Sequence, residues 1–212
     1  NAGMNRFVWN MRYPDSIRSE DGTGPIIIGP VASPGTYQVQ LTIGTSTEKQ
    51  TFDIRKDPRV NATQEDLDQQ FKWQINIRDK MSENSGAIGR VRKIRQQIEE
   101  LERKIGAQGE AAIATVANSL LEKLRSVEQE LTQTQPTGPS LGRVNTLTLD
   151  SKLAAIPANL SVSDWVPTDQ SLEVFSTISA KVDIQLGRFQ EILDKDLLEL
   201  NNLMREAEIP AI

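Results

Sequence analysis

Residues 63–105, TQEDLDQQFKWQINIRDKMSENSGAIGRVRKIRQQIEELERKI, decide the fold of this chain of 212 residues. The stretch contains no proline, which would remove a helical donor and clash with the preceding turn. It begins with Thr63 followed by acidic residues, a typical helix start, and Gly106 and Gly109 follow its end. The pattern predicts one helix of about 43 residues, roughly 64 Å long.

The apolar side chains of this predicted helix recur at spacings of three and four residues, as in a coiled coil. A second, shorter stripe accompanies them only near the start, so that end is expected to pack on two neighbours. The main seam comprises Trp73, Ile77, Met81, Ile88, Val91, Ile94, Ile98, Leu101 and Ile105, and the short stripe comprises Leu67, Phe71 and Ile75.

Three further segments have helical apolar periodicity. One runs from 110 to about 133, a short one centres on Leu153, and the last runs from Pro167–Thr168 to about Glu208. The second segment is little more than half the length of the first, so the short one can cover what remains. For residues 61–212 we therefore predict an elongated antiparallel bundle of three long helices plus a short one.

Residues 1–60 read as a β module. They hold six of the 13 glycines and five of the 10 prolines. Residues 37–43 and 50–54 alternate apolar and polar side chains, which predicts a hairpin around a turn at 44–48. Residues 6–10 are expected to form a third strand, and residues 14–30 a long loop. Three strands alone leave open edges, so the module is expected to be incomplete or to lean on the helices. The predicted fold class is α+β.

Composition excludes several kinds of chemistry. The chain has no Cys and no His, which rules out Ser-His-Asp and Cys-His nucleophiles and the usual zinc sites. No apolar run approaches the roughly 20 residues of a membrane helix, so we expect no membrane insertion. The formal charge is −5, and neither a catalytic residue nor a cofactor or metal site is predicted.

Two charged clusters have simple interpretations. The basic residues Arg90, Arg92, Lys93 and Arg95 are followed by glutamates, which favours a solvated helix face with i,i+4 pairs such as Arg95–Glu99 over nucleic-acid binding. The acidic residues Asp194, Asp196 and Glu199 flank an apolar stripe and are expected to face water. Both are therefore interpreted as structural.

Several stretches together resemble one family. They are 3–14 (GMNRFVWNMRYP), 29–41 (GPVASPGTYQVQL), 57–59 (DPR) before the long helix, and 167–171 (PTDQS) before the last one. They look like the C-terminal region of bacterial secreted β-propeller proteins with BNR or sortilin-type (VPS10-like) repeats, a glycosyl-hydrolase-like family. The resemblance covers nearly the whole chain but not the propeller, because no blade-length repeat occurs.

This resemblance implies a small, truncated Ig-like β-sandwich in residues 1–60 and an extracellular or periplasmic location. It implies a non-catalytic accessory region that acts as a spacer or docks to the propeller, and the apolar helix faces suggest a homodimer through the bundle.

The alternative is a module that binds carbohydrate or completes a glycan hydrolase site, with Trp9, Tyr13 and Trp165 as sugar contacts. For Trp165 a packing role over the last helix is favoured. A third interpretation is a cytoplasmic coiled-coil adaptor.

Overall fold

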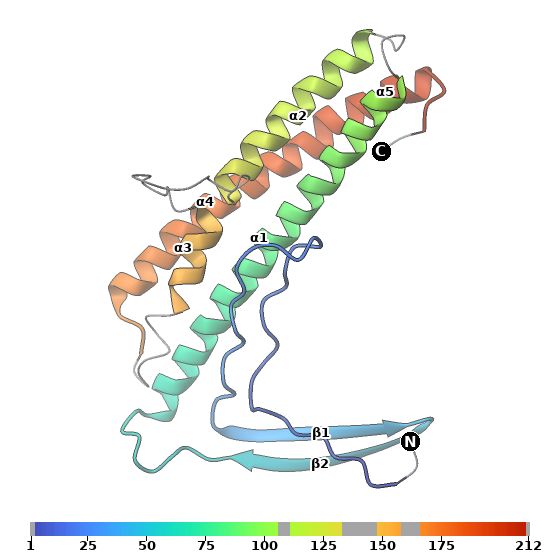
Figure 1. Cartoon of the computed structure of the whole chain (residues 1–212). Helices are drawn as coiled ribbons and strands as arrows, with labels where there is room; N and C mark the ends of the chain where they lie inside the picture. The colour runs from blue at the N-terminus through green and yellow to red at the C-terminus, as the bar shows by residue number, and fades with distance from the viewer. Residues whose placement is uncertain (1–2, 106–110, 133–147, 158–165, 211–212) are drawn as a thin grey trace, which may run out of the picture.

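The computed structural model describes residues 3–105, 111–132, 148–157 and 166–210. In these residues the protein is mixed α+β, with a two-stranded antiparallel sheet followed by packed helices (Figure 1). The strands are β1 (Gly35–Ile43) and β2 (Ser46–Ile54). The helical elements are α1 (Gln64–Ile105), α2 (Ala111–Leu131), α3 (Leu149–Ala155), α4 (Asp169–Ile192), the π-helical turn η3 (Leu193–Leu197) and α5 (Leu198–Glu206).

Helix α1 is the long rod that its sequence predicts, with 42 residues. A capping box sets its start. The Asp66 N–H donates to Thr63 Oγ1 at 3.1 Å, and the Thr63 N–H donates to Asp66 Oδ2 at 2.8 Å. Most of the predicted seam is buried, including Trp73, Ile77, Met81, Ile88, Val91, Ile98 and Leu101. The periodicity and the cap together therefore determine where this helix runs and which face it buries.

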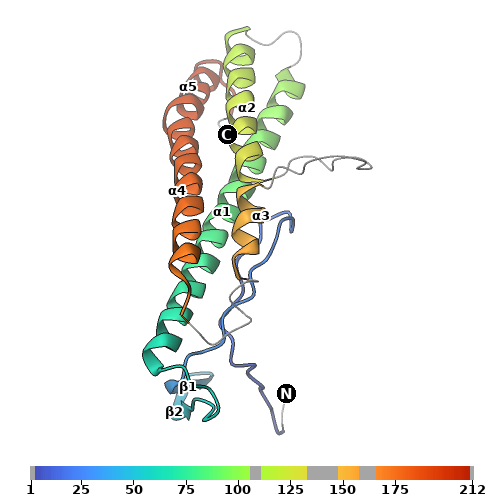
Figure 2. The same cartoon turned by 90° about the vertical axis from the view of Figure 1, so that its left-hand side faces the viewer.

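Helix α2 packs antiparallel to α1 at the end remote from the sheet. Arg92 pairs with Glu128, whereas Glu99, further along α1, pairs with Arg125, which comes earlier in α2. With 21 residues, α2 covers about half of α1. The short helix α3, with seven residues, continues on the same side of α1 beyond α2 and contacts both α1 and α4 (Figures 1 and 2).

The last helical segment runs parallel to α1. Trp73 packs edge-on against Phe175, and Arg90 lies over the Phe189 ring further along both helices. Thr168 caps its start by accepting a hydrogen bond from the Ser171 N–H at 3.3 Å, and α4, η3 and α5 follow one another without a break. A single apolar core runs along these helices, with Leu120, Leu124, Leu153, Val182, Leu200 and Met204 among its most buried members.

The β-hairpin lies beyond the lower end of the bundle (Figures 1 and 2). Its register pairs Gly35 with Ile54 and Ile43 with Ser46. The turn consists of Gly44 and one further residue, and Gly44 has a φ of +59°, a conformation that glycine adopts without steric cost. The hairpin is thus confirmed, with a tighter turn than predicted.

The predicted third strand at residues 6–10 is wrong. This segment is irregular, and just after it Met11 takes a left-handed φ of +59°, which ends an extended strand. The Asn10 side chain accepts the Arg12 N–H, a local turn that competes with sheet pairing. The Ig-like sandwich is likewise not formed by the described residues, whose only sheet is the hairpin.

Residues 11–32 form a loop that folds back on itself and lies along α1 (Figure 1). Its two arms are joined by backbone hydrogen bonds, from Tyr13 to Pro30 (2.9 Å) and from Ser16 to Ile27 (2.8 Å). Ile27 is buried in the bundle core, so the loop contributes to the helical fold. No helix among the described residues is both long and apolar enough to cross a bilayer.

Candidate interaction site at the hairpin

The hairpin is amphipathic, and its apolar face is uncovered. Alternation along β1 puts Tyr37, Val39, Leu41 and Ile43 on one face. The residues paired with them in β2 share that face and are Phe52, Gln50, Glu48 and Ser46, so its apolar part is a stripe along β1 with Phe52 at the base. The exposed fractions of Val39, Leu41 and Ile43 are 50%, 59% and 70%. We call these three side chains the apolar hairpin face. The opposite face is polar throughout, with Thr36, Gln38, Gln40 and Thr42 across from Asp53, Thr51, Lys49 and Thr47.

Trp9 belongs to the base of this face. Its ring lies 5.9 Å from Tyr37 and 6.2 Å from Phe52, centroid to centroid. Its Nε1–H donates to the Arg12 carbonyl at 2.9 Å. The indole is therefore half-buried and engaged on two sides, which gives it a packing role at the hairpin base.

Tyr13 connects the same region to α1. Its ring packs edge-on against Phe71 at 4.8 Å, and it lies beside the Tyr37 hydroxyl. The pKa of Tyr37 is raised above its usual value. Burial is the main cause, and the electrostatic effect of Tyr13 and its hydrogen bond with Tyr37 add to it. Of the three predicted sugar contacts, Trp9 and Tyr13 thus both lie beside Tyr37 at the hairpin base. Trp165 lies outside the described residues.

Polar contacts fix the hairpin to the first turns of α1. The Tyr37 hydroxyl donates to the Ser33 carbonyl at 2.7 Å, and the Ser33 hydroxyl donates to Asp68. The Gln64 amide donates to the Pro34 carbonyl at 2.9 Å. Because these bonds bracket the start of β1, the hairpin is held at a defined angle to the bundle while its outer part stays free.

A buried ion cluster holds the far end of the 11–32 loop. Glu128 of α2 accepts from Arg92 at 2.7 Å and from Arg95, and its side chain is only 3% exposed. Arg92 also donates to Asp21 and Thr23 at the loop tip. The interpretation of the basic cluster as a solvated face is wrong for Arg92 and Arg95. The Arg95–Glu99 pair is present, at 3.5 Å.

The loop tip is expected to detach in acid. Burial alone would raise the pKa of Asp21, but hydrogen bonds from the Thr23 N–H and hydroxyl and from Arg92 outweigh it and lower the pKa from 3.8 to about 2. A lowered pKa in the folded state stabilises the closed loop fully above pH 3.8. This stabilisation is lost as the pH falls through about 2.

An NMR titration of the Asp21 carboxyl checks this expectation. The midpoint should lie near 2, and in Arg92→Met it should move towards the ordinary value of 3.8. A midpoint near 3.8 in the unmodified protein would contradict the loop contact.

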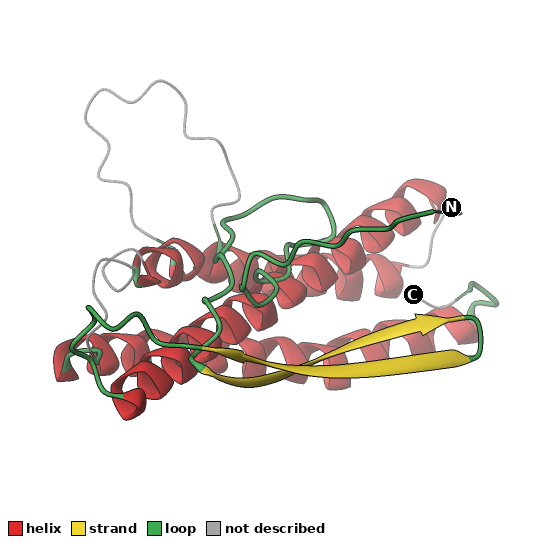
Figure 3. Ribbon diagram, turned by 90° about the horizontal axis from the view of Figure 1, so that it is seen from below, coloured by secondary structure: helices red, strands yellow, loops and turns green. Residues whose placement is uncertain are grey.

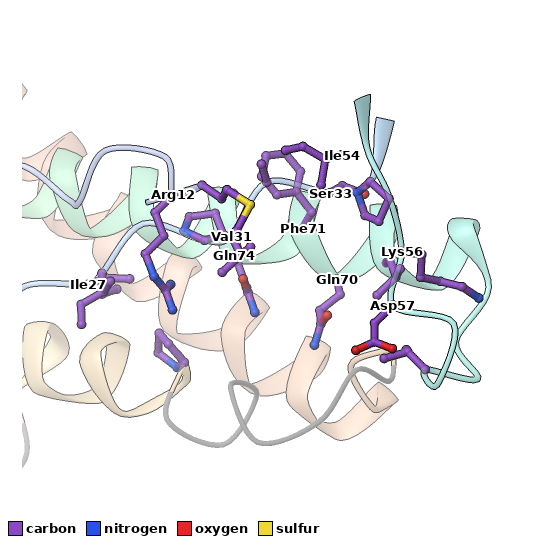
Figure 4. A pocket seen from close by; sticks show the side chains of 18 of the residues that line it. Arg12, Ile27, Val31, Ser33, Ile54, Lys56, Asp57, Gln70, Phe71 and Gln74 are labelled. Atoms are coloured by element: carbon purple, nitrogen blue, oxygen red, sulfur yellow. The ribbon is translucent and has the colours of Figure 1, made fainter. Parts of the chain in front are cut away.

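A cavity of about 730 Å³ lies where the loop, the hairpin base, α1 and α3 meet. Its polar lining includes Arg12, Gln70 and Gln74, whose side chains point to the same side from two different elements (Figure 4). Apolar residues such as Ile27 and Phe71 complete the lining. Trp9 and Tyr13 are not among the described residues that line it. No local sequence pattern indicates this cavity, because it depends on how the loop lies on α1.

The acidic residues near the end of the bundle form no clustered site. Asp196 pairs with Lys123 of α2 at 2.5 Å, and Asp194 accepts from the Gln190 amide at 2.8 Å. Among the described residues, no group of three or more Asp or Glu side chains could hold a metal ion. These carboxylates join helices or neighbouring turns.

Comparison with known proteins gives no relative from which to transfer a function. No family model, no curated protein and no solved structure matches the chain. The resemblance to propeller-associated regions stays a prediction, and the geometry must carry the functional argument.

Proposed function

We propose that this chain is a non-catalytic docking region of a larger exported protein, and that the apolar hairpin face is its contact surface. The observation that carries the proposal is the uncovered face itself. Exposed side chains that line up on one face of a strand indicate a surface completed by a partner. Both faces of the hairpin are exposed beyond its base, and of the two this face carries the apolar side chains.

The partner in this proposal is the β-propeller domain of the parent protein, as the family resemblance implies. The hairpin is then the part of an Ig-like sandwich that this chain contributes, and strands of the partner complete it. In this proposal α1, α2 and the segment from α4 to α5 act as the spacer. An exported, extracellular or periplasmic location follows from the same resemblance.

A homodimer through the bundle has weaker support. The exposed apolar side chains on α4 and α5 are Leu172, Val174, Ile184 and Leu198. They are distributed over widely separated turns, whereas a helix-packing face needs apolar residues on every turn. The hairpin offers the more continuous surface.

A titration tests the docking proposal. The propeller domain encoded by the same gene, produced separately, is titrated with this chain in a calorimeter. We expect saturable binding, and Leu41→Lys should weaken it about tenfold or more, because a charge would be buried against apolar surface. Lysine is chosen because Glu48 is paired with Leu41, so an acidic side chain would add like-charge repulsion within the hairpin.

The matched control is Gln38→Lys, which adds the same charge on the polar face of the same strand. It should leave the affinity unchanged. The proposal fails if the gene encodes no propeller, if the two chains do not bind, or if both substitutions weaken binding equally.

The cavity at the hairpin base supports a second candidate, carbohydrate binding. Planar amide and guanidinium donors beside an apolar wall can hydrogen-bond sugar hydroxyls. Saccharide titrations followed by tryptophan fluorescence test it. Gln74→Ala and Arg12→Ala should abolish a saturable signal, and Lys49→Ala, on the hairpin's polar face, should not.

A further inference from the structure

The two edges of the hairpin differ in a way that bears on assembly. β1 (GTYQVQLTI) contains no charged residue, whereas β2 (STEKQTFDI) carries Glu48, Lys49 and Asp53. Charges and prolines are the usual means by which proteins protect an open strand edge from pairing. Among the described residues nothing pairs with either edge. β2 is thus protected by charge, and β1 is open.

The hairpin register shows which backbone groups the open edge offers. In a hairpin with a two-residue turn, the residues that flank the turn form a hydrogen-bonded pair. Every second residue pair further along the strands is also hydrogen-bonded. Counting from Ile43 and Ser46, the N–H and C=O groups of Thr36, Gln38, Gln40 and Thr42 therefore point away from β2. This gives an unbroken row of donors and acceptors along β1.

We infer that the edge of β1 pairs antiparallel with β1 of a second copy of this chain, so that two hairpins form one four-stranded sheet. The register that overlaps all nine residues places Val39 opposite Val39 of the second copy, on the two-fold axis. Gln38 then pairs with Gln40, and Tyr37 lies opposite Leu41 on the apolar side. All apolar side chains stay on one face of the joined sheet.

A second copy suits this edge for reasons of charge and symmetry. Because β1 carries no charge, two copies meet without like-charge repulsion, and a charged partner strand would find no opposite charge to recognise. A two-fold contact uses the same patch on both chains, and this strand is self-complementary, since Gln meets Gln and Thr meets Thr across the axis. One strand from each side is a small interface, so the dimer is expected to be weak and concentration-dependent.

The edge and the apolar hairpin face are separate surfaces. Pairing at the edge leaves Val39, Leu41 and Ile43 uncovered on one side of the joined sheet and doubles that surface. The inference therefore does not rest on the docking proposal, and its experiments use the chain alone.

Disulfide trapping tests the register. The protein has no cysteine, so a single introduced thiol reports only contacts between copies. Directly opposed residues that are not hydrogen-bonded to each other have Cα atoms about 4.5 Å apart, within the reach of a disulfide. Val39→Cys should oxidise readily to a covalent dimer. Leu41→Cys, on the same face of the same strand, should do so far more slowly, because its opposite residue is Tyr37.

Proline substitution tests the edge. Gln40→Pro removes an outward donor of β1 and leaves the β1–β2 ladder intact, and Thr51→Pro does the same on the β2 edge. Sedimentation velocity at increasing concentration should show a dimer for the unmodified chain. In the two-fold dimer Gln40→Pro removes two hydrogen bonds, one from each copy, so it should weaken the dimer about thirtyfold. Thr51→Pro should not weaken the dimer. Circular dichroism of both variants checks that they keep their helices.

The outcomes separate clearly. Preferential trapping of Val39→Cys together with selective loss of the dimer in Gln40→Pro supports the inference. A chain that stays monomeric at every concentration, equal trapping at both cysteines, or equal effects of the two prolines overturns it. None of these results depends on whether the propeller domain binds.

Discussion

Glu128→Ala is expected to lower the free energy of unfolding by about 3 kcal/mol, because it leaves two arginines without their buried partner. The Glu128 side chain is 3% exposed, and Arg92 and Arg95 are 25% and 23% exposed. The charges that remain are therefore only partly solvated after the substitution. In a chain of this size the change corresponds to a fall in melting temperature of about 6–12 °C, which thermal unfolding followed by circular dichroism measures.

Glu130→Ala is the matched control for this substitution. Glu130 belongs to the same helix and carries the same charge, but it is exposed. Its replacement should change the stability by less than about 0.5 kcal/mol. Equal effects at the two positions would show that Glu128 contributes only its charge and not its specific contacts with the arginines.

Trypsin should also cut the Glu128→Ala protein faster at Arg18. Without Glu128, Arg92 is held less firmly, and so is the loop tip that Arg92 binds.

The helices could be predicted because their signals are local. The apolar seam of α1, the capping box at Thr63 and the cap at Thr168 are all read within a few residues, and each is present in the structure. The hairpin was also readable, since strict alternation in β1 and a glycine at the turn are local features. The alternation places the strand starts too late, at 37 and 50 instead of Gly35 and Ser46, and therefore predicts too long a turn.

Features that depend on how distant segments meet could not be predicted. Glu128 stands in a stretch of α2 that is mostly polar (RSVEQE, 125–130), where it resembles an ordinary exposed glutamate, and nothing in that stretch indicates that Arg92 and Arg95 lie opposite. The pattern at residues 6–10 suits a strand, but the turn at Met11 prevents pairing. Under the alternative function Trp9 and Tyr13 are predicted sugar contacts, and nothing in their sequence neighbourhood indicates that they pack with Tyr37, Phe52 and Phe71 (Figure 3 shows the hairpin and the loop they join).

Leu153→Ala should have a comparably large effect, and a local one. Leu153 is fully buried, and its helix α3 has only seven residues and no side-chain hydrogen bond at its N-cap. So short a helix is not stable by itself and depends on packing against α1 and α4. Removal of the leucine side chain from this contact is expected to cost about 3 kcal/mol.

The location of the change distinguishes this result from general destabilisation. Because α3 contacts α1 in the part that α2 does not reach (Figure 2), hydrogen exchange in Leu153→Ala should accelerate around Ile77 and Met81 of α1. Around Val91 and Ile98, where α2 covers the same helix, it should change little. Lys152→Ala, one residue earlier in α3 and half-exposed, serves as the control. A uniform increase along α1 would mean that the two halves of the bundle unfold as one unit, so that α3 is not a separately removable cover.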